Sequence, residues 1–449
     1  MNKKIFFTVI VVSCALILSS CFRPNYNVER VNNIRSTNHD IPQDDKTLVF
    51  VSLSGGGTRA AAMSWKALEE FKKIPYTYTD KNGNKVESTL ADEIDYISGI
   101  SGGSFAAAAW CFYKDDMELF RKRFIERNIQ STLVKKLFIP PSNGIKLISP
   151  YYDRINIASE LYDNEVFDKK TFNDLPAHPV LWINATHLAL GARFTYDKTY
   201  FDYLHSDLSK YPVGYACAAS SAFPILLSPI TLKNYGDSSN LTKDIKYKTA
   251  KMNSVNSVEM DFYCRSREFY NDKTNKFMHL ADGGLVDNQG LQAIIDQFNT
   301  NGIINKRLND RDNPLQRLII INVNAGVSAT DKSCRKEDAP HFNSVIEYTM
   351  VTSMNILSAK RWMKIKTKCV EVYKSKIDIG DKTKSLSLLE EPYTIEINFR
   401  NLNEEDRKNC NKLPTSFKLD AEQLGLIDRV VPVLIEEDPE IKRLKEKFE

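Results

Sequence analysis

Short apolar runs alternate with amphipathic segments between residues 47 and 325 of the chain. The apolar runs are rich in Val, Ile and Leu at neighbouring positions, which is typical of strands buried on both faces of a sheet. They occupy residues 47–54, 93–100, 180–190, 276–283 and 315–325. Helices are expected between them, at about 58–71, 103–112, 212–222 and 289–298. This alternation predicts an α/β fold, a three-layer α/β/α sandwich around a mostly parallel sheet.

Other parts of the chain do not follow this alternation. Residues 114–175 and 232–275 are longer and more polar, and we expect them to be insertions over one end of the sheet. From residue 341 onward the pattern predicts a long helix, a strand at 393–399 and a charged terminal helix. We therefore divide the globular part into a main domain, 45–334, and a C-terminal α+β extension, 335–449, packed on it.

The N-terminus has the pattern of an export signal. Lys3 and Lys4 precede the apolar stretch IFFTVIVVSCALIL, which is short for a transmembrane helix and suits a signal peptide. The stretch ends in LSSC, which resembles a bacterial lipobox, where small residues precede a cysteine that becomes lipid-modified. We expect residues 1–20 to be a lipoprotein signal peptide and Cys21 to be the lipidation site. An ordinary secretion signal with an incidental cysteine is the alternative.

The polar residues 21–44 then form a lipidated N-terminus and tether. This predicts an exported bacterial lipoprotein that is anchored to a membrane. Phe22 follows the cysteine in place of the aspartate associated with inner-membrane retention, so an outer-membrane location is favoured.

Composition indicates a globular protein and gives no sign of a nucleic-acid-binding or metal-binding one. The 449 residues are 42% hydrophobic and 26% charged, as in ordinary globular proteins. The net charge of +4 falls to 4 − 2 = +2 without Lys3 and Lys4, which gives no electrostatic reason to expect nucleic acid as a partner. Eight cysteines become six after cleavage and lipidation, and six allow 15 pairings with none favoured. With no C-x-x-C and no paired histidines, no metal site is expected.

Glycine is concentrated in three short segments, which hold nine of the 18 glycines: 55–57, 99–103 and 283–290. The middle segment, GISGG, has the form G-x-S-x-G, directly after a predicted strand and before an Ala-rich helix. This is the context of a nucleophile elbow, with Ser101 as the nucleophile and Gly99 and Gly103 making room for the sharp turn. A structural glycine turn is the plainer alternative.

The first glycine segment, GGGTRA, offers backbone N–H groups to the oxyanion that such a serine would create. We expect Gly55, Gly56 and Gly57 to form the oxyanion hole, with Arg59 fixing the loop or aiding the charge. A phosphate-binding loop is the competing interpretation, but the segment lacks the Lys-Ser/Thr of a P-loop and the spacing of a dinucleotide fold.

The base is expected in the third glycine segment, because none of the six histidines stands in a setting that suggests a triad. In HLADGGLVDNQG, Asp282 ends a predicted strand, and two glycines let the backbone turn around it. An ionised Asp282 within reach of Ser101 could accept its proton directly, in a dyad. His279 could tune this carboxyl group, although a structural role for it is favoured.

These segments together resemble the patatin-like phospholipases, serine acyl hydrolases with a Ser-Asp dyad. The chain has the family's glycine-rich loop as GGGTRA, its nucleophile motif as GISGG and its aspartate motif as DGG, in the family's order. AASSAFPILLSPI (218–230) resembles the family's Ala-Ser-x-Ala-x-Pro segment, but Gly290 stands where D-N-x-P would have proline. The resemblance covers about 47–330, and implies Ser101 as nucleophile and Asp282 as base.

The sequence therefore predicts an enzyme that hydrolyses ester bonds of (phospho)lipids, with no cofactor. Membrane lipids would be both substrate and anchor, and the oligomeric state is not indicated. Two alternatives remain: an esterase or thioesterase for soluble acyl substrates, and a surface lipoprotein that binds lipid or a partner without turnover. The basic segment 358–369 around Trp362 could contact anionic headgroups, although a solvated helix end is favoured.

Overall fold

The computed structural model describes residues 27–448 apart from 31–45, 81–82, 140–151, 225, 237–240, 242, 257, 300–301, 311–314, 328–336, 338–340, 375–387 and 389. The expected signal peptide and the lipidation site Cys21 therefore lie outside the described residues. Within the described residues, no helix combines the length and the apolar character needed to cross a membrane.

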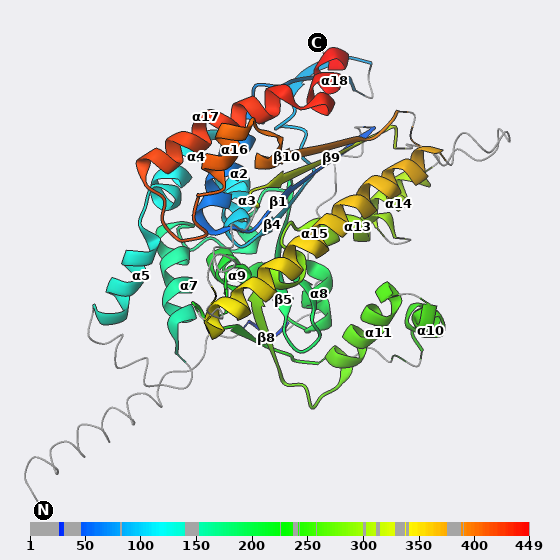
Figure 1. Ribbon diagram of the computed structural model, residues 1–449. Coiled ribbons are helices and arrows are strands. Elements are labelled where there is room, and N and C mark those ends of the chain that lie inside the picture. Colours follow the sequence, from blue (N-terminus) through cyan, green and yellow to red (C-terminus); the bar gives the residue numbers. More distant parts are fainter. Residues whose placement is uncertain are drawn as a thin grey trace, which may run out of the picture.

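One eight-stranded sheet forms the centre of the molecule, in the order β10-β9-β1-β4-β5-β8-β7 with β6 paired to β5 (Figure 1). Strands β10, β9, β1, β4 and β5 are parallel, which confirms the predicted α/β architecture with a mostly parallel sheet. The bounds are β1 Thr47–Leu53, β4 Tyr96–Ile100, β5 Val180–His187, β6 Ala192–Thr195, β7 Ile230–Lys233, β8 Phe277–Asp282, β9 Arg317–Asn324 and β10 Tyr393–Asn398.

Alternate residues of each central strand enter two different cores. On one face, Val49 and Val51 join a core with helices α2 Gly57–Phe71, α3 Gly102–Tyr113, α7 Arg154–Glu165, α9 Val213–Ser220, α17 Ala421–Glu437 and α18 Pro439–Phe448. On the other face, Leu48 and Phe50 pack with helices α13 Leu291–Ile295, α14 Ile303–Leu308 and α15 Phe342–Lys374. Both faces are thus covered, which explains the continuous apolar runs in the sequence.

The antiparallel strands were not distinguished by sequence. β8 runs antiparallel to β5 and β7, and β6 runs antiparallel to β5. Short strands β2 Pro75–Thr79 and β3 Lys85–Thr89 form a separate antiparallel pair. The first half of β8 alternates between exposed and buried side chains, the pattern of a strand with one solvated face.

The segment expected as an insertion at 232–275 contains two helices, α10 Ile245–Asn253 and α11 Val258–Asn271. They pack on each other at the lower right of Figure 1, and the end of α11 packs on the body, where Tyr270 is 1% exposed. The backbone N–H of Asn234 donates to the carbonyl of Lys276 at 2.9 Å, so the insertion leaves and rejoins the sheet at one point.

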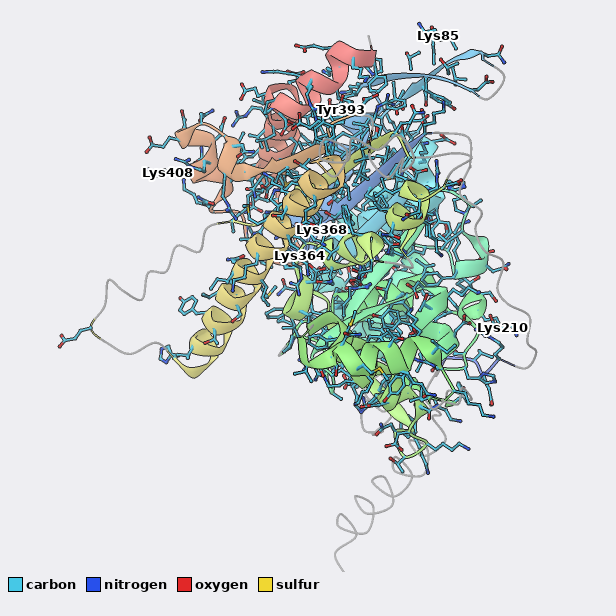
Figure 2. All side chains as sticks on the ribbon, turned by 90° about the vertical axis from the view of Figure 1, so that its right-hand side faces the viewer. Lys85, Lys210, Lys364, Lys368, Tyr393 and Lys408 are labelled. Atoms are coloured by element: carbon cyan, nitrogen blue, oxygen red, sulfur yellow. The ribbon has the colours of Figure 1, made fainter. Side chains whose placement is uncertain are left out.

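The expected C-terminal extension is continuous with the main sheet. Its strand β10 pairs in parallel with β9, and its helix α17 packs against α2. The long helix α15 lies across the opposite face against α12 (Gly284–Asp287) and α13 (Figure 1). Lys364 and Lys368 lie on this helix in Figure 2, whereas Trp362 of the same basic segment is buried in the core. The boundary at residue 335 stays a prediction.

Part of the expected tether is bound to the globular body. Asn27 is 2% exposed, and its side chain pairs with the backbone of Lys233 through two hydrogen bonds of 2.7 and 3.0 Å. Glu29 forms a β-bridge with Ser206, and Arg30 forms an ion pair with Asp202. Residues 27–30 are therefore not a free linker, because specific side chains attach them to the body.

Candidate active site

Ser101 lies at the carboxyl end of β4, on the turn into helix α3. Its backbone has φ of 49° and ψ of −122°, a strained conformation for a residue with a side chain. Such strain is typical of a nucleophile elbow, which holds the hydroxyl clear of the sheet. Ser101 is also the N-cap of the twelve-residue helix α3, so the positive end of the helix dipole faces any negative charge formed there.

The flanking glycines have no space for a side chain. A Cβ atom on Gly99 would lie 2.5 Å from the Cα of Ser104, and one on Gly103 would lie 2.4 Å from the carbonyl oxygen of Leu53. Both contacts are shorter than real Cβ atoms adopt. The glycines of the G-x-S-x-G motif therefore allow the first turn of α3 to pack directly on β1 and β4, as the motif predicts.

Asp282 ends β8 and reaches Ser101 from the neighbouring part of the sheet. The Ser101 side chain hydrogen-bonds to the Asp282 carboxyl group, and the N–H of Gly284 donates to Asp282 Oδ1 at 2.7 Å. Asp282 is 4% exposed, and burial raises its pKa from 3.8 to about 7, although both hydrogen bonds act in the opposite direction. The structure thus brings together the two residues expected to form the dyad.

The end of α9 and the residues that follow it fix both members of this pair. The N–H of Ser101 donates to Ser220 Oγ at 2.8 Å, and the Ser220 hydroxyl donates to the carbonyl of Asn184 at 2.7 Å. The N–H of Asp282 donates to the carbonyl of Ala222 at 2.9 Å. Ser220 and Ala222 belong to the AASSAFP segment that sequence analysis noted without giving it a role.

The glycine-rich loop lies against the elbow, but one of its three amides is already used. The N–H of Gly55 donates to the carbonyl oxygen of Asn288 at 2.8 Å. This corrects the expectation that Gly55 contributes to the oxyanion hole, because its donor closes the loop onto the segment that follows Asp282. The same bond holds the Asp287-Asn288-Gln289-Gly290 stretch, in which Gly290 stands in place of the family's proline.

Gly56 and Gly57 remain as candidate oxyanion donors. Both have positive φ, of 142° and 62°, and within the described part of the chain no hydrogen bond is recorded for either N–H. Sequence analysis missed a third candidate, the N–H of Gly102, the residue after the nucleophile, which contributes to oxyanion holes at nucleophile elbows. A Cβ atom on Gly102 would lie 1.9 Å from the carbonyl oxygen of Gly57, so the two segments are in direct contact.

Arg59 anchors the glycine-rich loop through hydrogen bonds to distant backbone carbonyls. It is 3% exposed, its Nε donates to the carbonyl of Ala325 at 3.0 Å, and its Nη1 donates to the carbonyl of Leu413 at 2.8 Å. Burial lowers the pKa of its guanidinium to about 10, so it stays charged at neutral pH. Of the two roles expected for Arg59, these contacts favour fixing the loop.

The histidines near the site have other partners. His187 is 1% exposed, burial lowers its pKa to about 4, and its Nδ1 accepts from the N–H of Leu190 at 3.1 Å. His279 Nδ1 lies 3.0 Å from the Thr231 hydroxyl. Among the described residues, no group of three His, Cys, Asp or Glu side chains is arranged to bind a metal ion. The five described cysteines are unpaired and buried.

Comparison with known families agrees with this geometry. The family model of the patatin-like phospholipases matches residues 51–295, more than half of the chain, including all three glycine-rich segments and Asp282. The chain belongs to the patatin-like phospholipase family. Membership in this family supports a lipid hydrolase.

The comparisons with individual proteins are more distant. Human GIVD cytosolic phospholipase A2 is a similar solved structure, with 11% identity and a TM-score of 0.32. That match covers 61% of this patatin-like chain and 45% of the human one, so the chain spans less than half of that protein. No curated protein matches the chain.

Proposed function

We propose that this chain is a serine acyl hydrolase that cleaves ester bonds of lipids through a Ser101–Asp282 dyad. The observation that carries the proposal is the buried carboxyl group of Asp282, hydrogen-bonded to a serine on a strained elbow. Family membership supports a lipid as the substrate class.

The proposed reaction proceeds in two steps. Ser101 Oγ attacks the ester carbonyl while the ionised Asp282 accepts its proton, and the N–H groups of Gly56, Gly57 and Gly102 bind the oxyanion. Asp282 then donates the proton to the departing alcohol, which leaves an acyl group on Ser101. Water, deprotonated by Asp282, attacks this acyl-enzyme, and Asp282 returns the proton to Ser101 Oγ as the fatty acid is released. No cofactor is needed for these steps.

The pKa of the base suits this chemistry. A carboxyl group with a pKa near 3.8 would be ionised at neutral pH but would hold a proton weakly. With a pKa of about 7, Asp282 is partly ionised at pH 7 and can both accept and return the proton. Burial of the Asp282 carboxyl group raises its pKa, so this burial at the end of β8 is part of the proposed mechanism.

Labelling with a fluorescent fluorophosphonate tests the proposal directly. We expect the full chain to be labelled, and Ser101→Ala and Asp282→Asn to remain unlabelled while folded. Ser131→Ala is a matched control, because the Ser131 hydroxyl donates within the first turn of α5 (Ile129–Phe138), away from the site. Labelling that persists in Ser101→Ala would refute the assignment of the nucleophile. A folded wild type without labelling would favour the binding lipoprotein instead.

The choice between a lipase and an esterase for soluble substrates needs a second measurement. A lipid hydrolase is expected to act faster on phospholipid vesicles or micelles than on the same acyl group in a short, monomeric ester. Equal rates per ester bond on both forms would favour the soluble substrate.

A further inference from the structure

The α10–α11 hairpin exposes large apolar side chains to solvent. Ile245 is 79% exposed, Met252 81% and Val255 91%, more than any other large hydrophobic side chain among the described residues. Ile245 and Met252 are seven residues apart, so they lie on the same face of α10. The hairpin lies at the lower right of Figure 1, and within the described chain these three side chains are largely uncovered.

The apolar residues are surrounded by positive charge. Residues 243–256 contain four lysines and one acid, a net charge of 4 − 1 = +3. The acid, Asp244, lies 3.6 Å from Arg267, so a second cation offsets it. All four lysines, at 243, 246, 248 and 251, are exposed, and Lys251 is also paired with Glu268 of α11 at 2.6 Å. Exposed apolar side chains among lysines are the pattern of a segment that binds an anionic lipid surface.

The strand register puts this hairpin on the same edge of the sheet as the nucleophile. Ile100, the last residue of β4, pairs with Asn184, and the next residue of β5, Ala185, pairs with Asp282. Because β8 runs in the opposite direction, its earlier residues lie progressively beyond the carboxyl end of β4. The hairpin rejoins the sheet just before β8, at Lys276, and therefore projects from the edge that carries the active site.

Other exposed apolar residues lie at this edge. Phe277, which begins β8, is 42% exposed, and Leu188, whose N–H donates to His279, is 44% exposed. The edge therefore has two exposed apolar side chains in addition to those of the hairpin.

The N-terminal residues 27–30 are attached to the body near the base of the hairpin. Asn27 is bonded to Lys233, the last residue of β7, from which the insertion begins. Cys21 is six residues before Asn27, so an extended chain between them spans at most about 20 Å. If Cys21 is lipidated, as the sequence predicts, the lipid is attached within this chain length of the base of the hairpin.

We propose that the α10–α11 hairpin docks on an anionic lipid bilayer and holds the active-site edge against it. Ile245, Met252 and Val255 enter the boundary between headgroups and acyl chains, and the lysines contact headgroup phosphates. This inference rests on the proposed function, because it supplies the lipid substrate to the Ser101–Asp282 site. The basic segment of α15 is less suited, since its aromatic residue, Trp362, is buried.

Amide hydrogen exchange of the full chain tests the docking. Because exchange is measured segment by segment, protection of the hairpin is distinguished from membrane binding by residues 1–26. Exchange is compared in buffer, with phosphatidylcholine vesicles, and with vesicles that also contain phosphatidylglycerol. We expect residues 245–255 to exchange several-fold more slowly on the anionic vesicles only, while α5 is unchanged. The triple variant Ile245→Ser, Met252→Ser, Val255→Ser should lose this protection. A matched triple variant, Met363→Ser, Val370→Ser, Val433→Ser, should keep it, since these residues are exposed on α15 and α17.

Several results would overturn the proposal. Unchanged exchange of the hairpin on anionic vesicles would refute docking, and equal protection on neutral vesicles would refute the choice of anionic lipid. Protection that grows with protein concentration without vesicles would assign the surface to a second copy of this chain.

Hydrolysis rates separate this inference from the proposed function. The hairpin triple variant should hydrolyse a soluble p-nitrophenyl ester at the wild-type rate, which also shows that it is folded, and bilayer phospholipid several-fold more slowly. A wild type that hydrolyses neither substrate contradicts the proposed function, whereas equal rates of wild type and variant on bilayers contradict the docking surface alone.

Discussion

Replacing Asp282 by Asn should stabilise the protein, and the stabilisation should grow as the pH rises. The carboxyl group is 4% exposed, and burial raises its pKa from 3.8 to about 7. The fold therefore prefers the protonated form, whereas the unfolded chain ionises with an ordinary pKa. An amide has nearly the same shape, can still accept the hydrogen bond from Gly284, and has no charge to bury.

The magnitude follows from linkage between protonation and folding. Below pH 3.8 the group is protonated in both states and gives no difference. Between pH 3.8 and about 7 the unfolded state is ionised while the folded state is not, so stability falls by about 1.4 kcal/mol per pH unit. Above the folded-state pKa the cost is constant, at about 4 kcal/mol. Between pH 5.5 and 8.5 the advantage of Asn over Asp at position 282 should increase by about 2 kcal/mol.

Urea unfolding followed by tryptophan fluorescence at pH 5.5, 7.0 and 8.5 measures this difference. The control is Ser101→Ala, which is also expected to be inactive but keeps the carboxyl group. It loses the hydrogen bond that lowers the pKa of Asp282, so its stability should fall with rising pH at least as much as that of the wild type. A constant difference between Asp282→Asn and the control over this range would mean that the pKa of Asp282 is not raised. A difference that shrinks as the pH rises would mean that the folded state stabilises the charged form.

Three further predictions concern activity. Hydrolysis of a soluble ester should rise about tenfold per pH unit below pH 7 and level off above it, since the base must be ionised; a profile flat from pH 5 to 8 would contradict this. Ser220→Ala removes the acceptor for the Ser101 N–H and should lower kcat by about 100-fold with KM little changed, whereas Ser221→Ala should not. Gly102→Ala forces a Cβ atom into the glycine-rich loop and should abolish labelling, whereas Gly425→Ala, with open space around it, should be neutral in the same fluorophosphonate assay.

Much of the fold could be predicted because the central strands are buried on both faces. Continuous apolar runs and intervening helical patterns marked β1, β4, β5 and β9 to within a few residues. The alternation with helices indicated a mostly parallel sheet, but the antiparallel strands within it could not be identified, since an apolar run has the same pattern in either direction. β8 shows this difficulty. It pairs with β5 in the antiparallel direction, with Asp282 opposite Ala185, and its composition does not indicate that direction.

The candidate dyad could be predicted because its chemistry requires rare local features. A serine with positive φ needs glycines around it, and Gly99 and Gly103 are visible in the sequence. Which N–H groups of the glycine-rich loop already have a hydrogen-bond partner could not be predicted in this way. Gly55 and Gly56 are adjacent and identical, yet only the N–H of Gly55 has a recorded partner, Asn288, which lies 233 residues farther along the chain.

The position of the glycine-rich loop also argues that the C-terminal residues are part of the proposed catalytic unit. The carbonyl of Ser416 accepts from the N–H of Thr58 at 2.8 Å, and the carbonyl of Leu413 accepts from the buried Arg59. A Cβ atom on Gly57 would lie 2.4 Å from the Ser416 oxygen, so the loop and this segment are in close contact. Oxyanion donors must be fixed before charge develops if they are to stabilise it. The residues that fix this loop come from both sides of position 335, so the chain beyond the matched family region contributes to the geometry of the site.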